Sequence, residues 1–545
     1  MPLLSAERRR SAAFRPVALG SVLALTAGLL VALAPAASAE DSMTDLGVAA
    51  SAGDLVVGGG KIAVAAGDRI VVADTTGKLT GTVTGLSDVH SLVMTDDGNR
   101  LYAALTGSNE VAEIDTATLE ITRRIDLAAY PCPTSLALTG KRLWVGHDCS
   151  ADGVLSLDLS VATPEPSPFE TPLKAGPRIA AAGNTLVVGE GAGSPADLFV
   201  YDVSGPAPVL RGEIDGHKYD NYSLKDVTVT PDGSHAISAF ALPYSFDMWD
   251  TTTLAKVRGY EGPQFDGWPS AVAISPDGAY IAGARDTGVA MTVYDAASGA
   301  KVFAEDTSTG EVVGGSVAFS GRDVFSLVKS SADKLYLWRL HDVTLPASTL
   351  TLTAAPGGTA HAPLTMTGHL AFAGGTAPGA QPLTVTRTLP DGTSAELPGV
   401  TTATDGAFTV TDEPPVGGQI TYTVRWKGDG EHRWSRASVT TAVRYGTAVT
   451  LTGPEILDKT LVFRGVLRFE GIPLPRNLRV IVERTLNADA GSTRWWSAAV
   501  RSDGSYMFAD TPDAGEYTYT VRWAGDGRTG PAQASQVVTV HEPNG

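Results

Sequence analysis

Short apolar strands alternate with glycine-rich turns along most of the chain. In residues 95–118, TDDGNRLYAALTGSNEVAEIDTAT, a turn is followed by a strand, a loop, a second strand and a second turn. The same order of polar and apolar positions begins again at Thr230 and at Ser275, and each time an Asp lies seventeen residues after the glycine of the Asp-Gly turn. Runs of four to eight residues with this alternation predict half-buried β-strands.

A glycine turn before the second strand marks seven repeats of this unit. Each unit contains an apolar strand, a turn, a second strand, a loop, a third strand that often ends in Asp, and a short fourth strand. A lone sheet of this size buries too little apolar surface to be stable, so such repeats are expected to stack radially. The pattern predicts a seven-bladed β-propeller over residues 40–345. The turn glycines, spaced by 38 to 50 residues, are Gly60, Gly98, Gly140, Gly183, Gly233, Gly278 and Gly321.

The seventh unit has three clear strands instead of four. We expect residues 40–52 to supply the missing strand and to close the ring, because closure removes the exposed edges of an open ring. An Asp at the end of a third strand, before Thr, Ala or Ser, hydrogen-bonds the backbone two residues on and so predicts a turn rather than a catalytic group. Four units end their third strand in this way, at Asp74, Asp115, Asp250 and Asp295.

A second, longer repeat follows the propeller segment. The sequence TYTVRW occurs twice, each time before a GDG turn, and its tryptophans Trp426 and Trp523 lie 97 residues apart. Short alternating strands separated by turn signals in about 100 residues indicate a β-sandwich. We expect one such domain over residues 346–445 and another over residues 446–541, with the two tryptophans as inter-sheet plugs or strand-edge aromatics.

These patterns predict an all-β protein in which a seven-bladed β-propeller is followed by two immunoglobulin-like β-sandwich domains. The segments SPDGAYIAG, TVYDAASGAKV and VAEIDTATLEI resemble the secreted bacterial YVTN-type and WD-like β-propeller repeats, although the namesake tetrapeptide of the first family is absent. The repeated TYTVRWxGDG resembles the bacterial immunoglobulin-like repeats of surface and secreted proteins. For the C-terminal domains this resemblance implies spacing, stalk or adhesion roles and no chemistry.

Residues 1–39 are typical of a cleavable secretory signal. The arginines Arg8 to Arg10 precede a long apolar run, which ends at a small-residue cleavage site, Ala37-Ser38-Ala39. An uncleaved membrane anchor is the alternative. No later segment is apolar for long enough to span a bilayer, so we expect a secreted, extracellular protein, free or associated with the cell wall.

The charge and the cysteines agree with this location. Cleavage would remove four arginines and Glu7, and the formal net charge would change from −18 to −21. An acidic protein repels nucleic acid, which argues against a nucleic-acid partner. The two cysteines, Cys132 and Cys149, are expected to form a disulfide in an oxidising space, and two cysteines alone are too few for a zinc site.

The sequence contains no motif that assigns a reaction. There is no nucleophile elbow of the form G-x-S-x-G, no H-E-x-x-H zinc motif, no haem attachment motif and no EF-hand calcium loop. We therefore assign no catalytic residue, no cofactor and no metal ligand, and we expect that the protein is not an enzyme.

Candidate ligand-binding residues come from the connections between one blade and the next, which gather at one rim of a propeller. Two adjacent connections, residues 214–226 and 260–270, are longer and more aromatic than the others. Aromatic faces beside carboxylates suit sugar rings or peptide side chains. The alternative is that the aromatic residues pack between blades. The candidates are His217, Tyr219, Asp220, Tyr222, Phe265, Asp266 and Trp268.

The sequence thus favours a secreted, non-enzymatic binding or adhesion protein. Its propeller would recognise an extracellular protein or a glycan, including those of the cell wall, and its sandwiches would act as a spacer. Two alternatives are an extracellular enzyme, like the lactonases and lyases that are built on similar propellers, and a structural matrix protein.

Overall fold

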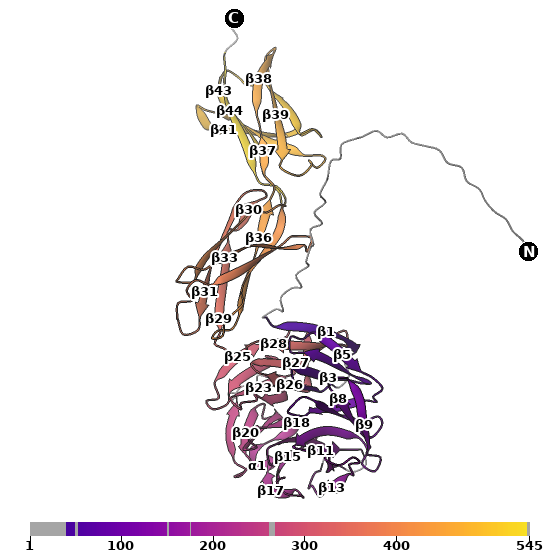
Figure 1. Cartoon of the computed structure of the whole chain (residues 1–545). Coiled ribbons are helices and arrows are strands. Elements are labelled where there is room, and N and C mark those ends of the chain that lie inside the picture. Colours follow the sequence, from indigo (N-terminus) through magenta and orange to yellow (C-terminus); the bar gives the residue numbers. More distant parts are fainter. Residues whose placement is uncertain (1–39, 50–52, 150–151, 175, 261–266, 542–545) are drawn as a thin grey trace, which may run out of the picture. The chain divides into compact units, whose positions relative to one another are not determined.

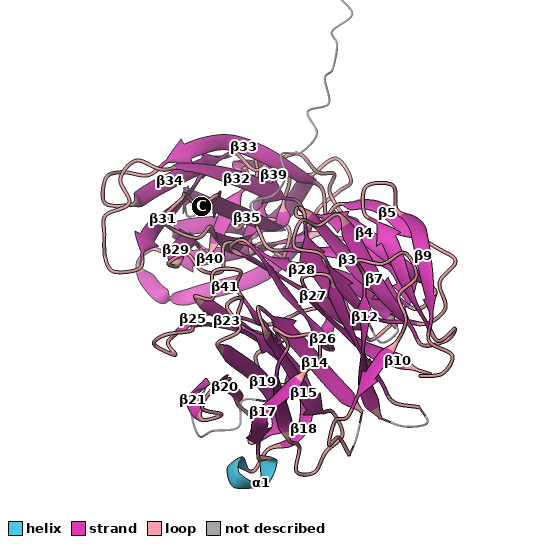
Figure 2. Ribbon diagram, turned by 60° about the horizontal axis from the view of Figure 1, so that its bottom comes forward, coloured by secondary structure: helices cyan, strands magenta, loops and turns pink. Residues whose placement is uncertain are grey.

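The computed structural model describes residues 40–49, 53–149, 152–174, 176–260 and 267–541. Within these residues the chain is almost entirely β-strand, with one short helix, α1 (Gly216–Tyr219) (Figure 1, Figure 2). No helix in the described part is long and apolar enough to cross a membrane. The predicted signal segment lies outside the described residues.

Residues 42–340 form seven four-stranded antiparallel sheets, which we number 1 to 7 in chain order. Sheets 1 to 3 consist of β2 (Leu55–Gly58), β3 (Lys61–Ala66), β4 (Arg69–Asp74) and β5 (Leu79–Val83); β6 (Val89–Met94), β7 (Arg100–Leu105), β8 (Glu110–Asp115) and β9 (Glu120–Asp126); and β10 (Pro133–Thr139), β11 (Arg142–His147), β12 (Gly153–Asp158) and β13 (Ser167–Phe169). Sheets 4 to 6 consist of β14 (Pro177–Ala182), β15 (Thr185–Glu190), β16 (Leu198–Asp202) and β17 (Val209–Ile214); β18 (Tyr222–Val229), β19 (His235–Leu242), β20 (Phe246–Asp250) and β21 (Lys256–Tyr260); and β22 (Pro269–Ile274), β23 (Tyr280–Arg285), β24 (Met291–Asp295) and β25 (Lys301–Glu305).

Sheet 7 joins the two ends of this region. Its strands are β26 (Gly310–Ser320), β27 (Asp323–Ser330), β28 (Lys334–Leu340) and β1 (Ser42–Ala49), in the order β1-β28-β27-β26. The antiparallel register of β1 on β28 places Met43 opposite Trp338. The N-terminal segment therefore supplies the fourth strand of the last sheet, as its position in the sequence predicts.

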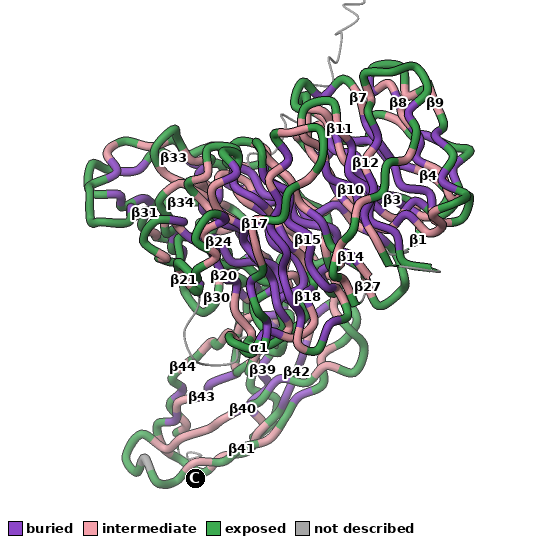
Figure 3. The backbone as a smooth tube through the Cα atoms, turned by 90° about the horizontal axis from the view of Figure 1, so that it is seen from below, coloured by how far each residue is buried: buried purple, intermediate pink, exposed green. Residues whose placement is uncertain are grey.

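The first strands of the seven sheets form a closed, propeller-like ring. They contact one another in chain order, β2, β6, β10, β14, β18, β22 and β26, and β26 also contacts β2. Apolar residues between neighbouring sheets form the core: Ile70 and Val72 of sheet 1, for example, pack with Leu92 and Leu101 of sheet 2. The second and third strands are the most buried parts of these sheets (Figure 3).

The turn chemistry expected from the sequence is present. All seven turn glycines have positive φ, between 56° and 76°, a region that favours glycine. Asp115 accepts hydrogen bonds from the backbone N–H groups of Thr118 and Ala117. These bonds, together with Arg100, lower the pKa of its carboxyl. The other three predicted turn aspartates accept the same kind of bond from a residue two or three positions on.

A disulfide joins Cys132 to Cys149, as the sequence predicts. It links the connection before β10 to the residues that follow β11. Within the same segment the N–H of Asp148 donates to the carbonyl oxygen of Cys132. The bond therefore ties two connections of sheet 3 together.

Residues 348–540 form four further sheets in two groups, 348–444 and 447–540. In the first group β29 (Ser348–Ala354), β31 (Leu364–Phe372) and β34 (Ala407–Asp412) form one sheet, and β30 (Gly357–Thr359), β36 (Ser435–Arg444), β35 (Gly418–Trp426), β32 (Pro382–Thr388) and β33 (Ser394–Thr401) form the other. In the second group β37 (Thr447–Val449), β39 (Thr460–Phe469), β38 (Thr452–Leu457) and β42 (Ser505–Asp510) form one sheet, and β41 (Asp489–Ala499), β40 (Arg479–Leu486), β43 (Gly515–Trp523) and β44 (Ala532–Val540) form the other.

The two repeated tryptophans lie in the cores of these groups. Trp426 is buried and its ring packs against Phe372, while its Nε1–H donates to the side-chain oxygen of Gln381. Trp523 is half-buried against Phe469. Both therefore act as aromatic packing residues between strands.

Candidate functional site

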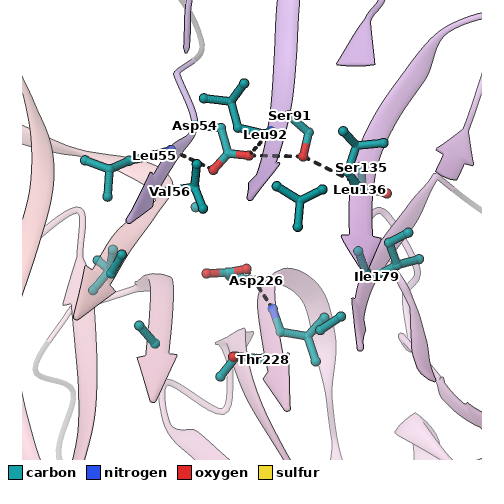
Figure 4. Close-up of a pocket in the computed structure, with 18 of the residues that line it drawn as sticks. Asp54, Leu55, Val56, Ser91, Leu92, Ser135, Leu136, Ile179, Asp226 and Thr228 are labelled. Carbon is teal, nitrogen blue, oxygen red and sulfur yellow. Dashed lines mark hydrogen bonds between the residues drawn. The ribbon is translucent and has the colours of Figure 1, made fainter. Parts of the chain in front are cut away.

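A channel of about 650 Å³ runs through the centre of the seven sheets. It is lined by the first strand of every sheet, so each strand contributes a few residues and no single segment carries the site. Figure 4 shows Asp54 and Asp226, from sheets 1 and 5, pointing toward the space between these strands. Most of the other labelled lining residues are aliphatic.

One position of the first strand recurs in all seven sheets and forms what we call the channel ring. In each sheet this residue lies opposite the fifth residue of the second strand, as Ser91 lies opposite Ala104. Four of the six other members follow from the same pairing, Asp54 follows from the hydrogen bond that its carbonyl oxygen accepts from the N–H of Ala65, and Ser316 follows from its hydrogen bond with the N–H of Leu327. The members of the channel ring are Asp54, Ser91, Ser135, Arg178, Asp226, Ala271 and Ser316.

Side chains of the channel ring connect neighbouring sheets. The Oδ2 atom of Asp54, in sheet 1, accepts hydrogen bonds from the hydroxyl of Ser91 (3.0 Å) and the N–H of Leu92 (2.7 Å) in sheet 2. In the same way, Oδ2 of Asp226 in sheet 5 accepts a bond of 2.8 Å from the N–H of Val272 in sheet 6. The other carboxylate oxygen of each Asp accepts from the next residue of its own strand.

The serines of the channel ring continue this pattern. Ser91 accepts a hydrogen bond from the N–H of Leu136 in sheet 3, and Ser135 donates to the carbonyl oxygen of Pro177 in sheet 4. The boundaries between sheets 1 and 2, 2 and 3, 3 and 4, and 5 and 6 are thus bridged by a side chain at one level of the channel. These bonds give the polar residues of the ring a structural role.

The two carboxyl groups also have perturbed acidity. Burial raises the pKa of Asp226 to about 7, and the N–H groups of Val272 and Val227 offset part of this effect. Arg178 lowers this pKa because its positive charge stabilises the Asp226 carboxylate, and Asp54 raises it because its negative charge repels that carboxylate. Burial also raises the pKa of Asp54. A carboxyl group that titrates near neutral pH can donate or accept a proton, so Asp226 is the residue of the channel best suited to acid-base chemistry.

Basic groups lie beside these acids. His90 and Lys225 each precede a ring residue and also line the channel. Nδ1 of His90 lies 2.8 Å from the carbonyl oxygen of Thr134, and because a carbonyl only accepts, Nδ1 must carry the proton. The channel therefore combines acidic and basic side chains within a mainly aliphatic wall.

The candidate residues of the connections lie where the chain enters the first strands of sheets 5 and 6. Tyr219 in α1 packs edge-on against Trp249 with 4.9 Å between ring centroids, which is a packing contact. His217 and Asp220 are exposed, and the carboxylate of Asp215 caps the helix by accepting from the N–H of His217. Tyr222 is half-buried at the start of β18.

The second connection is only partly described. Phe265 and Asp266 lie outside the described residues. Trp268 is 47% exposed directly before β22, and its carbonyl oxygen accepts from the N–H of Asp286. Trp268 is thus the most exposed of the aromatic candidates that the structure describes.

The channel ring was not among the residues predicted from the sequence. Asp54 and Asp226 are carboxylates within apolar strands, in GDLVVG and KDVTVT, six and seven residues before the turn glycines Gly60 and Gly233. Because these distances differ, an alignment of the repeats on their glycines does not place the two residues in one column, and the available signal in the sequence is a carboxylate within an apolar innermost strand.

Two groups of described residues have donors that can reach one metal ion. Asp197, Glu213 and Asp215 form one, and Asp323, His341 and Asp342 form the other. Asp197 forms an ion pair with Lys174, and Asp323 forms one with Arg339. Because a cation already compensates a carboxylate in each group, neither supports a metal assignment.

No protein-family model matches the chain, and no curated protein sequence matches it. Similar solved structures include the β-propeller domain of Cps50 (Swd1) from Myceliophteria thermophila, at 13% identity and a TM-score of 0.42, over 52% of this chain and 99% of that one. Hydrazine synthase from Kuenenia stuttgartiensis has 18% identity and a TM-score of 0.41 over 51% of this chain and 92% of that one. Hsv2 from Kluyveromyces lactis has 13% identity and a TM-score of 0.39 over 55% of this chain and 98% of that one. None of these similarities bears on the function of the chain.

Proposed function

We propose that the chain is a secreted, non-enzymatic binding protein. In this proposal the seven sheets are the blades of one β-propeller, residues 346–445 and 446–541 are two immunoglobulin-like domains, and residues 1–39 direct export. The disulfide between Cys132 and Cys149 supports an oxidising location. The ligand is an extracellular protein or glycan, including components of the cell wall.

The propeller binds this ligand at the end where the chain enters the first strands. The observation that carries this proposal is the exposure of Trp268, which is 47% exposed and lies three residues before the channel ring residue Ala271. An exposed aromatic ring offers both apolar area and a flat face to a ligand. Lys225, which lines the channel, adds hydrogen-bond donors, and the Nε2 atom of His90 adds an acceptor because the proton on Nδ1 is already donated to Thr134.

The hydrogen bonding of the channel ring supports binding over catalysis. The carboxylates of Asp54 and Asp226 each accept backbone N–H groups from two sheets. A group held by such bonds is positioned to stabilise the ring, and moving it toward a substrate would leave N–H groups without an acceptor.

Binding can be tested with the purified full-length chain and insoluble cell-wall and extracellular glycan fractions, by co-sedimentation. Trp268→Ala is expected to weaken binding without changing the melting temperature. Val302→Ala is the matched control, because Val302 is 38% exposed on β25, the outermost strand of the same sheet. A folded Trp268→Ala protein that binds as well as the native one would place the ligand elsewhere, and loss of its fold would support a packing role for Trp268.

The raised pKa of Asp226 favours one second candidate, an enzyme that uses this carboxyl as a general acid or base in the channel. Lactones and substrates of lyases would be the first to assay. Asp226→Asn removes the titrating proton and retains an amide oxygen as acceptor. An activity that this substitution abolishes in a folded protein would establish the second candidate in place of the first.

A further inference from the structure

Two adjacent tryptophans in β41 point to opposite faces of their sheet. Trp496 faces the core, where its ring packs edge-on against Phe508 with 5.8 Å between centroids. Trp495 faces outward and is 56% exposed. Successive side chains of a strand alternate between faces, so one indole is half-buried against the core and the next is presented to solvent.

The register defines the surroundings of Trp495. Glu483 of β40 lies directly opposite it, and Ile481, 40% exposed, lies two residues along on the same face. Arg522 of β43 lies opposite Ile481. Its guanidinium carbon is 5.5 Å from the centre of the Trp495 ring, and its Nη2 atom is 2.7 Å from the carboxylate of Glu483. We call Ile481, Glu483, Trp495 and Arg522 the outer platform.

Hydroxyl groups surround the outer platform on the same face. Thr485 and Thr493, in β40 and β41, form a hydrogen-bonded pair at 3.1 Å. Thr520 and Ser535, in β43 and β44, form another at 2.9 Å. The face is therefore a polar sheet surface with one large aromatic ring and one aliphatic side chain at its centre.

The first sandwich provides an internal comparison, because its corresponding sheet has the same strand order, with a register shift between Leu383 and Val385. Thr384 lies opposite Arg425 there, as Ile481 lies opposite Arg522 in the second sandwich. Glu396 lies opposite Thr386, at the place that Trp495 occupies opposite Glu483. The first sandwich thus has Thr and Glu where the second exposes Ile and Trp, so the apolar centre is not a requirement of the fold.

We propose that the outer platform binds a glycan, with a pyranose ring stacked on Trp495 and its hydroxyl groups hydrogen-bonded to Glu483 and Arg522. Trp495 is 56% exposed although the guanidinium of Arg522 lies over its ring, so a large part of the indole is open to a ligand. A pyranose has an apolar C–H face and a polar hydroxyl edge, and the platform offers an aromatic face beside a carboxylate and a guanidinium.

The size of the apolar centre favours a sugar over a protein. A stable protein interface buries roughly 800 Å² on each partner around an apolar core. Trp495 and Ile481 together supply only a small part of such an area, and the residues around them are hydroxyl-bearing or charged. One or two sugar rings need no more than this.

The test uses the purified full-length chain with three defined probes: cellohexaose, chitohexaose and insoluble peptidoglycan. We expect binding to at least one of them, measured by titration of tryptophan fluorescence or by co-sedimentation. Trp495→Ala should weaken this binding roughly tenfold or more and leave the melting temperature unchanged. Ile456→Ala is the matched control, because Ile456 is 71% exposed on β38 of the opposite sheet.

A gain-of-function variant extends the test. Thr384→Ile with Thr386→Glu and Glu396→Trp places the other three platform residues beside Arg425 of the first sandwich, and should raise the binding stoichiometry. Equal binding by native and Trp495→Ala proteins, or no binding to any of the three probes, would overturn the proposal. So would a concentration-dependent dimer that Trp495→Ala abolishes, since the face would then bind a second copy of the chain. Trp268→Ala reports separately on the propeller, so the two sites can fail independently.

Discussion

The carboxylate of Asp226 accepts a 2.8 Å hydrogen bond from the backbone N–H of Val272, across the boundary between two neighbouring sheets. Asp54 makes the equivalent bond to Leu92 at 2.7 Å. The same register position of the innermost strand thus carries the same inter-sheet contact in sheets 1 and 5. In each case the partner is the first strand of the next sheet, so these contacts hold the wall of the central channel together.

Removing one of these contacts should destabilise the ring of sheets. Asp226→Ala leaves the N–H groups of Val272 and Val227 without their acceptor, and we expect the free energy of unfolding to fall by about 1–3 kcal/mol. Chemical denaturation with urea measures this change. Lys225→Ala is the control, because Lys225 is exposed beside Asp226. Equal effects of the two substitutions would contradict a structural role for the Asp226 carboxylate.

The raised pKa of Asp226 predicts a pH dependence of stability with a defined sign. In the folded state this carboxyl titrates at about 7, and its ordinary value is 3.8. Between these values the folded state binds more protons than the unfolded state. The contribution of Asp226 to stability is therefore largest below pH 4 and is lost as the pH rises toward 7.

This dependence can be isolated with Asp226→Asn, which does not titrate. We expect the melting temperature of the native protein relative to Asp226→Asn to decrease between pH 4.5 and pH 7.5. Other carboxyls, such as that of Asp232, have a lowered pKa and act in the opposite direction at lower pH, but they are common to both proteins. A constant difference between the two proteins across this range would contradict the raised pKa.

The pairing of β1 with β28 predicts that the N-terminal strand is needed for stability. Deleting Ser42–Ala49 removes a whole strand from sheet 7 and leaves β28 as an exposed edge. We expect a melting temperature lower by several degrees and a greater tendency to aggregate, measured by scanning calorimetry and light scattering. Lys334→Ala removes only the exposed ion pair with Asp45 and should leave the melting temperature nearly unchanged, because solvent screens such a pair. An unchanged melting temperature after the deletion would show that the ring is stable without closure by β1.

The disulfide between Cys132 and Cys149 closes a loop with a sequence separation of 17 residues. In the chain-entropy model a loop of this size restricts the unfolded chain by about 3 kcal/mol. Replacing both cysteines by Ala should lower the free energy of unfolding by up to this amount, measured with urea under non-reducing conditions. If the native protein and the variant unfold at the same urea concentration, the bond contributes no stability.

The architecture could be predicted from the sequence because its signals are local. Gly98 and Gly233, for example, have positive φ in tight turns, and Asp115 and Asp250 accept hydrogen bonds from residues two or three positions on. Such contacts depend on neighbouring residues alone. Their regular recurrence was enough to predict repeated four-stranded sheets, as well as the strand that Ser42–Ala49 contributes to the last one.

The candidate site was harder to predict because its members are far apart in the chain. Asp54 and Ser91 are 37 residues apart, and Asp226 and Val272 are 46 apart. The sequence instead favours the aromatic residues of two long connections as ligand-binding candidates. Of these, Tyr219 packs against Trp249, whereas Trp268 is exposed.

The sequence by itself determined the strands, the turns and their repetition, since glycine conformation, turn hydrogen bonds and the alternation of apolar residues act over a few positions. Only the tertiary structure decided which residues meet at the channel and which aromatic rings face solvent. Trp495 and Trp496 illustrate the difference: alternation requires them to lie on opposite faces, but packing against Phe508 of the other sheet half-buries Trp496 and leaves Trp495 exposed. Burial depends on what lies against a face, and that partner comes from distant parts of the chain.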